Sequence, residues 1–326
     1  PGSRWLLRSE KRRTRGRYAQ RTNWSRWAKR TGTCTLPRSP SASWLRDLTE
    51  EGVEPNPGPR YVTKNLNGVS SLAKWERVLL AVKREHRRCP IKAIFVQEHN
   101  LTNSKIAGHV AKAYQLGFEF FAASIRGNDA RGRPIIKGGT GILIPRDQIE
   151  LKDGETYHDA TKRIQGTKRQ LPQGRGVAID VNIGERKLRL ASIYAHSDRE
   201  ADARPAFFKS LKHFNFINSK TILGIDANCV PDVQLDVRNH SQSPYTNTGA
   251  NELQDVVVDN DLIDVAREWL GNDTFFTSFH NVSGGLLTQT RIDRIYAPNL
   301  DGLSAVHVPG VHDFFARDHD SLEFDH

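Results

Sequence analysis

The sequence predicts a mixed-sheet α/β sandwich. Apolar runs typical of buried strands occur in adjacent, hairpin-like pairs, and amphipathic stretches typical of helices lie between some of them. This arrangement favours mixed sheets over the purely parallel sheet of Rossmann proteins. No glycine-rich phosphate loop of the Walker or dinucleotide type is present. The segment GGTG at 138–141 precedes a strand rather than a helix, so we interpret it as a turn.

The individual elements follow from apolar spacing. Helices are expected where apolar residues recur at three- and four-residue intervals, at 70–88, 104–116, 204–216 and 251–260. In the first of these, we expect the apolar face to come from Leu72, Leu79, Leu80 and Val82. Strands are expected over short runs rich in β-branched and aromatic residues, at 61–66, 91–97, 118–124, 140–145, 176–182, 188–194, 221–226, 274–279, 291–298, 303–309 and 320–324.

The positive charge is concentrated at the start of the chain. The net charge is +11, and residues 1–30 hold 11 Lys and Arg against the single acid Glu10. Residues 1–42 also interleave Trp5, Trp24 and Trp27 with the basic residues. Such a segment is typical of a flexible arm that binds phosphates and stacks bases. A disordered leader with no specific partner is the alternative, and nuclear targeting is a third reading.

Composition excludes several classes of protein. The cysteines Cys34, Cys89 and Cys229 are far apart and form no CxxC pair, which indicates a reduced, intracellular protein without structural zinc. No run is long enough to span a membrane, and no secretory signal is present. Methionine is absent altogether, including at position 1, so we expect the sequence to be a fragment that lacks its natural start.

Residues 43–59 read SWLRDLTEEGVEPNPGP, a short helical stretch that must stop at Gly52 and the prolines after it. A rigid linker is the plain interpretation. The end of this segment also resembles the 2A-like ribosome-skipping peptide, which ends in NPGP. That resemblance implies that the Gly58–Pro59 bond is not made during translation. Gly52 stands where that family usually has Asp.

Polar residues unsuited to a core end several predicted strands. In TILGIDAN, at 221–228, period-two alternation places Asp226 and Asn228 on the same side of a strand end. A carboxylate and an amide in that position suit work on water and phosphate oxygen. Each such residue has a structural alternative as a turn, cap or ion pair. Strand ends of a sandwich converge on one rim, which favours a shared site for Asn65, Asn67, Glu98, Tyr194, Asp226, Asn228, Asp293, Asp318 and His319.

The motifs NLNG, QEHNL, IYA, GIDAN, TRIDRIY and DHDSLEF occur in that order along 60–326. They resemble the endonuclease/exonuclease/phosphatase superfamily, and most closely the apurinic-type endonuclease domain of non-LTR (LINE-type) retrotransposons. The resemblance implies a four-layer α/β sandwich of two mixed β-sheets flanked by helices. It also implies dependence on Mg²⁺, with Mn²⁺ as an alternative, and nicking of double-stranded DNA.

The resemblance also implies a role for each matching residue. Glu98 and Asp318 match the metal carboxylates, with Asn65 and Asn67 near the metal. Asp226 matches the residue that orients or deprotonates the attacking water, and Asn228 and Tyr194 match groups at the phosphate. Asp293 and His319 match an Asp–His pair, in which the carboxylate would raise the pKa of the imidazole and orient it. His196 stands where relatives usually have Pro, and Arg317 where Ser is common.

Basic residues outside these motifs are candidates for contacts to DNA phosphates. We interpret 161–176 as a loop, and 126–137 as a second basic segment. A solvated surface is the alternative for any one of these side chains. The candidates are Arg131, Arg133, Arg163, Lys168, Arg169 and Arg175, together with Arg291 inside the motif TRIDRIY.

The sequence therefore favours an intracellular enzyme that acts in the nucleus as the endonuclease of a retrotransposon. The nicked strand's 3′-hydroxyl would prime reverse transcription, element RNA would bind the basic leader, and a reverse transcriptase would follow in the polyprotein. A host abasic-site repair enzyme of the same fold is one alternative. A catalytically dead fragment that only binds nucleic acid is another. The predicted organisation is a leader at 1–42, the 2A-like segment at 43–59 and the nuclease domain at 60–326.

Overall fold

The computed structural model describes residues 60–69, 71–88, 90–127, 132, 137–183, 186–238, 245, 247–281, 287–298, 305–307 and 322–325. All of them belong to the compact unit Asn56–His326. The predicted leader, the 2A-like segment with Gly58 and Pro59, and the candidate residues Arg131, Arg133, Asp318 and His319 lie outside the described residues.

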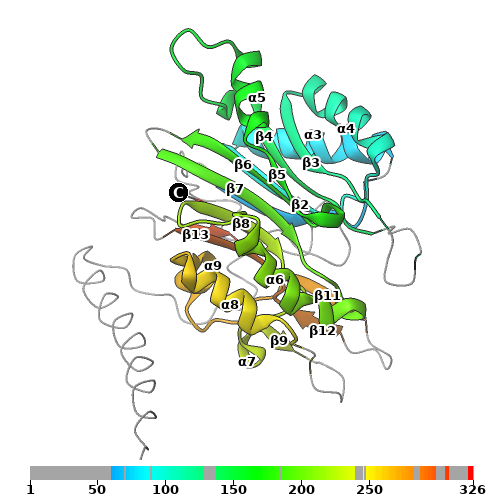
Figure 1. Ribbon diagram of the computed structural model, residues 1–326, viewed down its shortest axis with the longest axis vertical. Helices are drawn as coiled ribbons and strands as arrows, with labels where there is room; N and C mark the ends of the chain where they lie inside the picture. The colour runs from blue at the N-terminus through cyan, green and yellow to red at the C-terminus, as the bar shows by residue number, and fades with distance from the viewer. Residues whose placement is uncertain are drawn as a thin grey trace, which may run out of the picture. The chain divides into compact units, whose positions relative to one another are not determined.

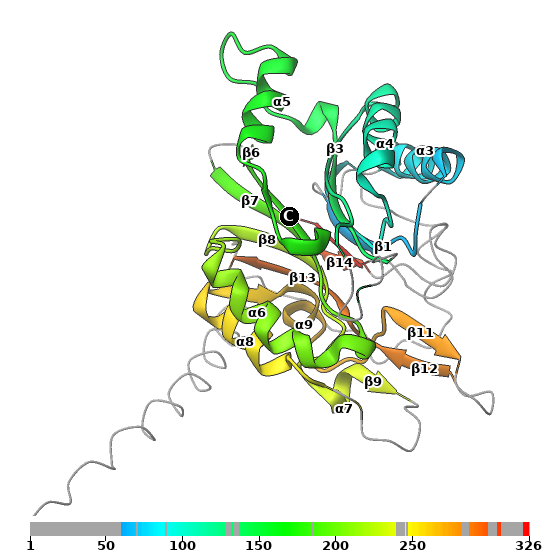
Figure 2. The same ribbon diagram turned by 45° about the vertical axis from the view of Figure 1, so that its right-hand side comes forward.

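Two large mixed sheets form the centre of this unit (Figures 1 and 2). Over the described residues, the first sheet has the order β14-β15-β1-β2-β4-β3. Its strands are β1 (Arg60–Asn65), β2 (Ile91–Gln97), β3 (Phe118–Ala123), β4 (Thr140–Pro145), β14 (Ala305–His307) and β15 (Leu322–Asp325). Strands β1 and β2 are parallel, and the other neighbours in this sheet are antiparallel.

The second sheet has the order β10-β13-β8-β7-β6-β5 in the described part of the chain. Its strands are β5 (Arg169–Gln170), β6 (Gly176–Ile183), β7 (Arg186–Tyr194), β8 (Thr221–Asp226), β10 (Leu262–Asp264) and β13 (Asp293–Pro298). Here too one central pair, β7 and β8, is parallel, and its neighbours are antiparallel. A small third sheet contains β9 (Val237–Arg238), β11 (Ser278–Asn281) and β12 (Leu287–Thr290).

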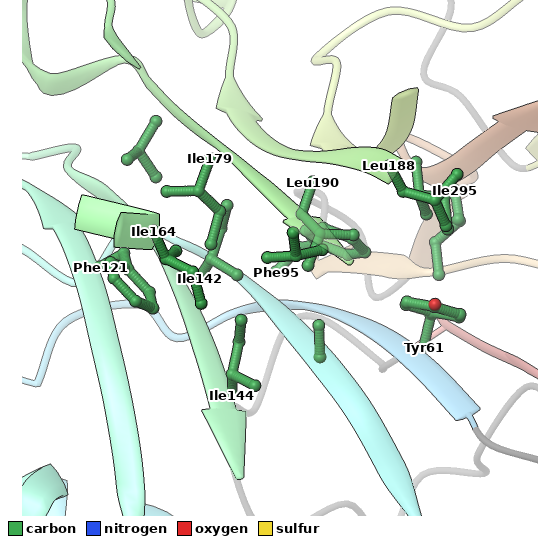
Figure 3. Packing of buried hydrophobic residues seen from close by; sticks show 14 of the residues in the cluster. Tyr61, Phe95, Phe121, Ile142, Ile144, Ile164, Ile179, Leu188, Leu190 and Ile295 are labelled. Atoms are coloured by element: carbon green, nitrogen blue, oxygen red, sulfur yellow. The ribbon is translucent and has the colours of Figure 1, made fainter. Parts of the chain in front are cut away.

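The apolar core lies between the two large sheets (Figure 3). Phe95 of β2 and Ile142 of β4 face Ile179 of β6 and Leu190 of β7, and all are buried. Burying these side chains is the main favourable contribution to folding, and it requires the sheets to lie face to face.

Helices cover the outer face of each sheet and complete a four-layer α/β sandwich. On the first sheet lie α3 (Leu72–Arg88) and α4 (Asn103–Gln115), with Trp75 fully buried against strand residues. On the second sheet lie α6 (Arg204–His213) and α8 (Ala250–Asp259), which bury Phe208 and Leu253. The predicted fold class is therefore confirmed.

The remaining helical segments are short. They are α5 (Tyr157–Gly166), α7 (Val233–Asp236) and α9 (Val265–Leu270), with 3₁₀ turns η1 (Arg146–Gln148), η2 (Pro172–Gly174) and η3 (Asp198–Ala203). No helix among the described residues combines the length and the apolar character needed to cross a bilayer.

The basic segment 161–176 is not the predicted loop. It contains the end of α5, the strand β5 and the turn η2. The helix begins with a capping box in which Thr156 and Asp159 satisfy each other's backbone amides, and it buries Ala160 and Ile164. Two apolar residues four positions apart are enough to dock one short helix face.

The apolar face of α3 is also narrower than predicted. Leu79 and Val82 are buried, but Leu72 and Leu80 are 46% and 49% exposed. Leu80 lies on another side of the helix from the buried stripe, which Trp75, Val78 and Ala81 complete, and Leu72 is the first residue of the helix. The predicted strand at 274–279 begins only at Ser278.

Gly224 of β8 allows the two sheets to approach closely. An added Cβ there would lie 2.3 Å from the Cβ of Phe95. We therefore expect Gly224→Ala to lower the free energy of unfolding by about 1–3 kcal/mol through overpacking, measured by urea denaturation. Gly166→Ala is the matched control, since a Cβ at the end of α5 would meet nothing within 4 Å. Equal stability of the two variants would contradict this account.

Candidate active site

The carboxyl ends of the two parallel strand pairs carry most of the predicted site residues. Asn65 ends β1, and Glu98 follows the end of β2. In the other sheet, Tyr194 ends β7 and lies in register with Asp226 at the end of β8. The antiparallel strand β13 begins at Asp293, which pairs with Asp226 from the other side. Residues distant in sequence are therefore placed together at one edge of the sandwich.

Asp226 is the centre of a buried hydrogen-bond network that joins the two sheets. Its side chain is 1% exposed, and its Oδ2 accepts a bond of 2.8 Å from Nδ2 of Asn65. Its Oδ1 accepts the backbone N–H of Asn228 at 3.2 Å. The Oδ1 of Asn65 in turn accepts the backbone N–H of Asn67 at 2.9 Å. Asn65 therefore uses both ends of its amide within the protein.

Tyr194 and Glu98 meet across the sheets. The Tyr194 hydroxyl lies close enough to the Glu98 carboxylate for that group to act on its pKa. Burial raises the pKa of Tyr194 well above its ordinary value, and the negative charges of Glu98 and Asp226 raise it further. The phenol is therefore protonated at neutral pH and is a hydrogen-bond donor at the edge where Asp226 lies.

Asn228 and Asp293 complete the described part of the site. The Nδ2 of Asn228 donates a bond of 3.2 Å to the carbonyl of Ala195, directly after Tyr194. Asp293 is fully buried, and its backbone N–H donates to Thr277 Oγ1 at 3.0 Å. Directly opposite residues of an antiparallel pair lie on the same face of the sheet, so Asp293 lies beside Asp226.

The loops around the site hold residues in an unfavourable backbone conformation. Of the seven described non-glycine residues with positive φ, four lie in these loops: Asn67, Glu98, Asn100 and Asn228. Glutamate adopts φ values such as the +47° of Glu98 rarely. Strain of this kind persists only where surrounding contacts enforce it, and it is concentrated at functional sites.

His99 and Gly139 enforce the conformation of the Glu98 loop. The His99 ring is fully buried, with Nδ1 accepting the backbone N–H of Leu101 at 3.0 Å and Nε2 lying 3.1 Å from the carbonyl of Thr140. Desolvation lowers the pKa of His99 to about 4, so the ring is neutral at pH 7. Gly139, with φ +82°, leaves room for this ring, because a Cβ there would lie 2.2 Å from it.

A layer of polar residues below the site was not predicted. Gln97 Nε2 donates to Thr63 Oγ1 at 3.1 Å and to Ser192 Oγ at 3.2 Å, and so links the two sheets. Ser192 Oγ donates to the carbonyl of Val96 at 2.9 Å. The available signal was the presence of polar residues inside strands that are otherwise apolar. These bonds fix the spacing of the sheets just below Asp226.

The donors at this edge suit a hard divalent cation. Glu98 is only partly buried and offers a carboxylate, and Asn67 is an exposed residue of a neighbouring loop. The backbone N–H of Gly68 donates to the Glu98 carbonyl at 2.7 Å, which holds the two loops together. Oxygen donors of this kind fit Mg²⁺. Within the described ranges, no group of three or more His, Cys, Asp and Glu side chains forms a metal site.

The predicted DNA contacts lie in different places. Arg163 binds Glu155 with two bonds of 2.7 and 2.8 Å. It lines a small pocket with Lys92, at the start of β2. The start of β2 is about 20 Å along the strand from Glu98, so Arg163 is remote from the site. By contrast, Lys168 donates to the carbonyl of Ala122 near the end of β3 that faces the site. Arg169 lies 3.5 Å from Asp180.

Two other predicted contacts are buried, and the structure does not support a DNA-binding role for either. Arg291 is 1% exposed and donates to Asp236 at 2.6 Å and to Asp264 at 2.7 Å. Arg175 is 7% exposed and pairs with Glu200 at 2.6 Å. Withdrawing either guanidinium from its carboxylate to reach a phosphate would leave a buried charge unpaired.

No protein-family model matches the chain, and no curated protein matches its sequence. Solved structures do match. An AP endonuclease from Archaeoglobus fulgidus aligns with a TM-score of 0.58 and 14% identity, over 82% of this chain and 98% of that one. The fold is that of the endonuclease/exonuclease/phosphatase proteins.

Two further matches agree with this assignment. A variant of the 3′ phosphatase NExo from Neisseria, bound to product DNA hairpin, has a TM-score of 0.58 and 17% identity, over 82% of this chain and 98% of that one. The AP endonuclease LMAP from Leishmania major has a TM-score of 0.57 and 12% identity, over 90% and 92%. At such identities, the matches show the endonuclease/exonuclease/phosphatase fold and no more.

Proposed function

We propose that this chain is a metal-dependent phosphodiesterase that nicks double-stranded DNA as the endonuclease of a non-LTR retrotransposon polyprotein. The observation that carries the proposal is the buried bond from Asn65 to Asp226 at the rim of the sandwich. It connects the two sheets at the point where Glu98, Tyr194 and Asp293 also converge.

The chain's own residues have complementary roles at a phosphodiester. Asp226 accepts a proton from the attacking water and is held in place by Asn65. Tyr194 donates to an oxygen of the developing pentacovalent phosphate, and Asn228 donates its second amide N–H there. Protonated His319, oriented by Asp293, is assigned the same task from the segment outside the described residues.

Glu98, with Asp318 and Asn67, would hold the metal ion. When bound there, Mg²⁺ offsets the charge of the phosphodiester and stabilises the leaving 3′ oxygen, and Mn²⁺ is the alternative ion. Lys168 and the exposed Arg126 lie near the same edge of the sandwich and are suited to DNA phosphates. Arg131, Arg133 and Arg169 are retained as weaker candidates for such contacts.

The retrotransposon assignment rests on the ordered motifs and on the 2A-like segment ending at Pro59. It implies an intracellular protein with its site of action in the nucleus. It also implies element RNA as a ligand of residues 1–42, and a downstream reverse transcriptase that uses the nicked 3′-hydroxyl as a primer.

Nicking of supercoiled plasmid tests the proposal. With Mg²⁺ we expect open-circular product whose 3′ ends a polymerase extends directly, and with EDTA we expect none, because the phosphate charge is then not offset. Restoring activity with excess Mg²⁺ or Mn²⁺ controls for damage by the chelator. Failure to nick with either ion would refute the proposal. Strong preference for an abasic duplex over an intact one would indicate the repair enzyme instead.

A further inference from the structure

Arg175 lies buried directly behind Tyr194 and contacts several parts of the site. Its Nη2 donates to Oε2 of Glu200 at 2.6 Å, and its Nη1 donates to the carbonyl of Ala195 at 3.3 Å. The guanidinium carbon lies 5.6 Å from the centre of the Tyr194 ring, within the range of a cation–π contact. The side chain therefore contacts the Tyr194 ring, the residue that follows it and the 3₁₀ turn η3.

The Ala195 carbonyl connects Arg175 to the predicted catalytic groups. It accepts from Arg175 Nη1 and also from Asn228 Nδ2, at 3.2 Å. The backbone N–H of Ala195 donates to the carbonyl of Asp226 at 2.9 Å. The carbonyl of Arg175 itself accepts the backbone N–H of Tyr194 at 2.9 Å. Arg175 thus hydrogen-bonds to the backbone of Tyr194 through its carbonyl and to the backbone of Ala195 through its side chain.

Glu200 holds Arg175 in this position. The same Oε2 atom also lies 2.8 Å from Nδ1 of His196. Arg175 makes a third hydrogen bond, in which its Nε donates to Oε1 of Gln173 at 3.3 Å. Gln173 itself has a φ of +59°. To reach a DNA phosphate, Arg175 would have to give up all of these contacts.

The charge of Arg175 also fits a supporting role. The carboxylate of Glu98 acts on it electrostatically, in addition to Glu200. Burial lowers the pKa of Arg175, while Glu200 opposes the shift, and a guanidinium remains protonated in either case. A fixed positive charge behind Tyr194 offsets part of the negative charge of Glu98.

We propose that Arg175 is a positioning residue that holds Tyr194 and the Ala195–Asn228 contact in place for the reaction, that Glu200 locks it there, and that it does not contact DNA. This inference rests on the proposed function, and it adds a residue that holds the proposed phosphate-binding groups in position. It replaces the prediction from sequence that Arg175 binds phosphate.

Steady-state kinetics of Arg175→Ala separate positioning from DNA binding. We expect kcat for nicking to fall about 10- to 100-fold, as is usual for a residue supporting an active-site group. KM and its dependence on salt should not change. A matched control is Arg126→Ala at the exposed rim, where KM should rise and the slope of log K against log salt should fall by about 1. An unchanged kcat in Arg175→Ala, or a raised KM with weaker salt dependence, overturns the inference.

The variant Glu200→Gln distinguishes a positioning role of Arg175 from a DNA-binding role, because the two roles predict different effects. If Glu200 locks a positioning residue, kcat falls, and Arg175→Ala/Glu200→Gln is no worse than Arg175→Ala alone, because the two act as a unit. If Glu200 merely restrains a DNA-binding arginine, releasing it tightens DNA binding. Tighter binding by Glu200→Gln therefore overturns the proposal. Arg175→Lys, which keeps a charge and one bond, should give an intermediate kcat and serves if the alanine variant does not fold.

Amide hydrogen exchange gives a measurement that needs no activity. Loss of the brace in Arg175→Ala or Arg175→Lys should speed exchange over 195–203, while the core strands keep their protection. Should the natural protein fail to nick DNA, the proposed function falls, yet faster exchange in this segment would still support the bracing by Arg175. Unchanged exchange over 195–203 in both variants overturns the inference whatever the nicking assay shows.

Discussion

Asp226→Asn is expected to lower kcat for DNA nicking by about 10²- to 10⁴-fold, the usual contribution of a positioned general base. The amide is nearly the same size as the carboxylate, but it accepts no proton at neutral pH. The loss should appear in kcat rather than in KM, because Asp226 is 1% exposed and lies below the groups that meet DNA.

The hydrogen-bond network predicts a second effect of this change. Asp226 accepts through both oxygens, from Asn65 and from the backbone of Asn228. An asparagine offers one acceptor oxygen, so one donor would face an NH₂ group. Asn65 cannot turn over to correct this, because its own oxygen accepts from Asn67. We therefore expect a loss of about 1–3 kcal/mol in stability alongside the loss of activity.

The measurement is single-turnover nicking of plasmid, with circular dichroism at the assay temperature to show that the variant is folded. Asp259→Asn is the matched control, because Asp259 is 45% exposed at the end of α8 and makes only a surface pair with Lys212. Undiminished nicking by folded Asp226→Asn would remove Asp226 from the mechanism.

Much of the fold could be predicted because apolar periodicity and burial coincide in it. The strands at 91–97, 118–123 and 140–145 are mostly apolar, and nearly all of their residues are buried in the four-layer arrangement. The predicted helices α3 and α8 carry a regular apolar stripe. The α-helices that were not predicted, α5, α7 and α9, bury few apolar side chains each and depend on capping by Thr156, Asp232 and Asp264.

The site could be predicted only in part, for a physical reason. Asn65, Glu98, Tyr194 and Asp226 could be predicted as site residues, because each is a polar residue at the end of an apolar run. Their partners are set by the packing of one sheet on the other, which local sequence does not specify. The bridge through Gln97 and Ser192 and the brace from Arg175 arise in this way. Charge alone does not give the partners of Arg163, Arg175 and Arg291, since an arginine in sequence looks the same whether it faces a phosphate or a carboxylate of the protein.

Asp236→Ala is expected to lower the free energy of unfolding by about 3–5 kcal/mol, the cost of removing one partner from a buried ion pair. Asp236 is fully buried, and its Oδ1 accepts from Arg291 Nε at 2.6 Å and from Arg267 Nη2 at 2.5 Å. Removing the carboxylate leaves Arg291 with Asp264 as its one carboxylate partner among the described contacts. Because Arg291 lies two residues before Asp293, we also expect lower nicking activity from the proposed active site.

The dependence of stability on pH checks the cause. Burial alone would raise the pKa of Asp236, but the bonds and charges of Arg291, Arg294 and Arg267 outweigh it and hold the pKa below its ordinary value of 3.8. A lowered folded pKa gives stability that is present above pH 3.8 and is lost as the pH falls through the folded value. Urea unfolding should therefore show that the difference in the free energy of unfolding between the natural protein and Asp236→Ala becomes smaller as the pH falls below 3.8. Glu76→Ala, which breaks the partly exposed pair with Lys112, should cost less than about 1 kcal/mol. A loss below about 1 kcal/mol for Asp236→Ala would mean that the ion pairs of Asp236 with Arg291 and Arg267 do not stabilise the fold.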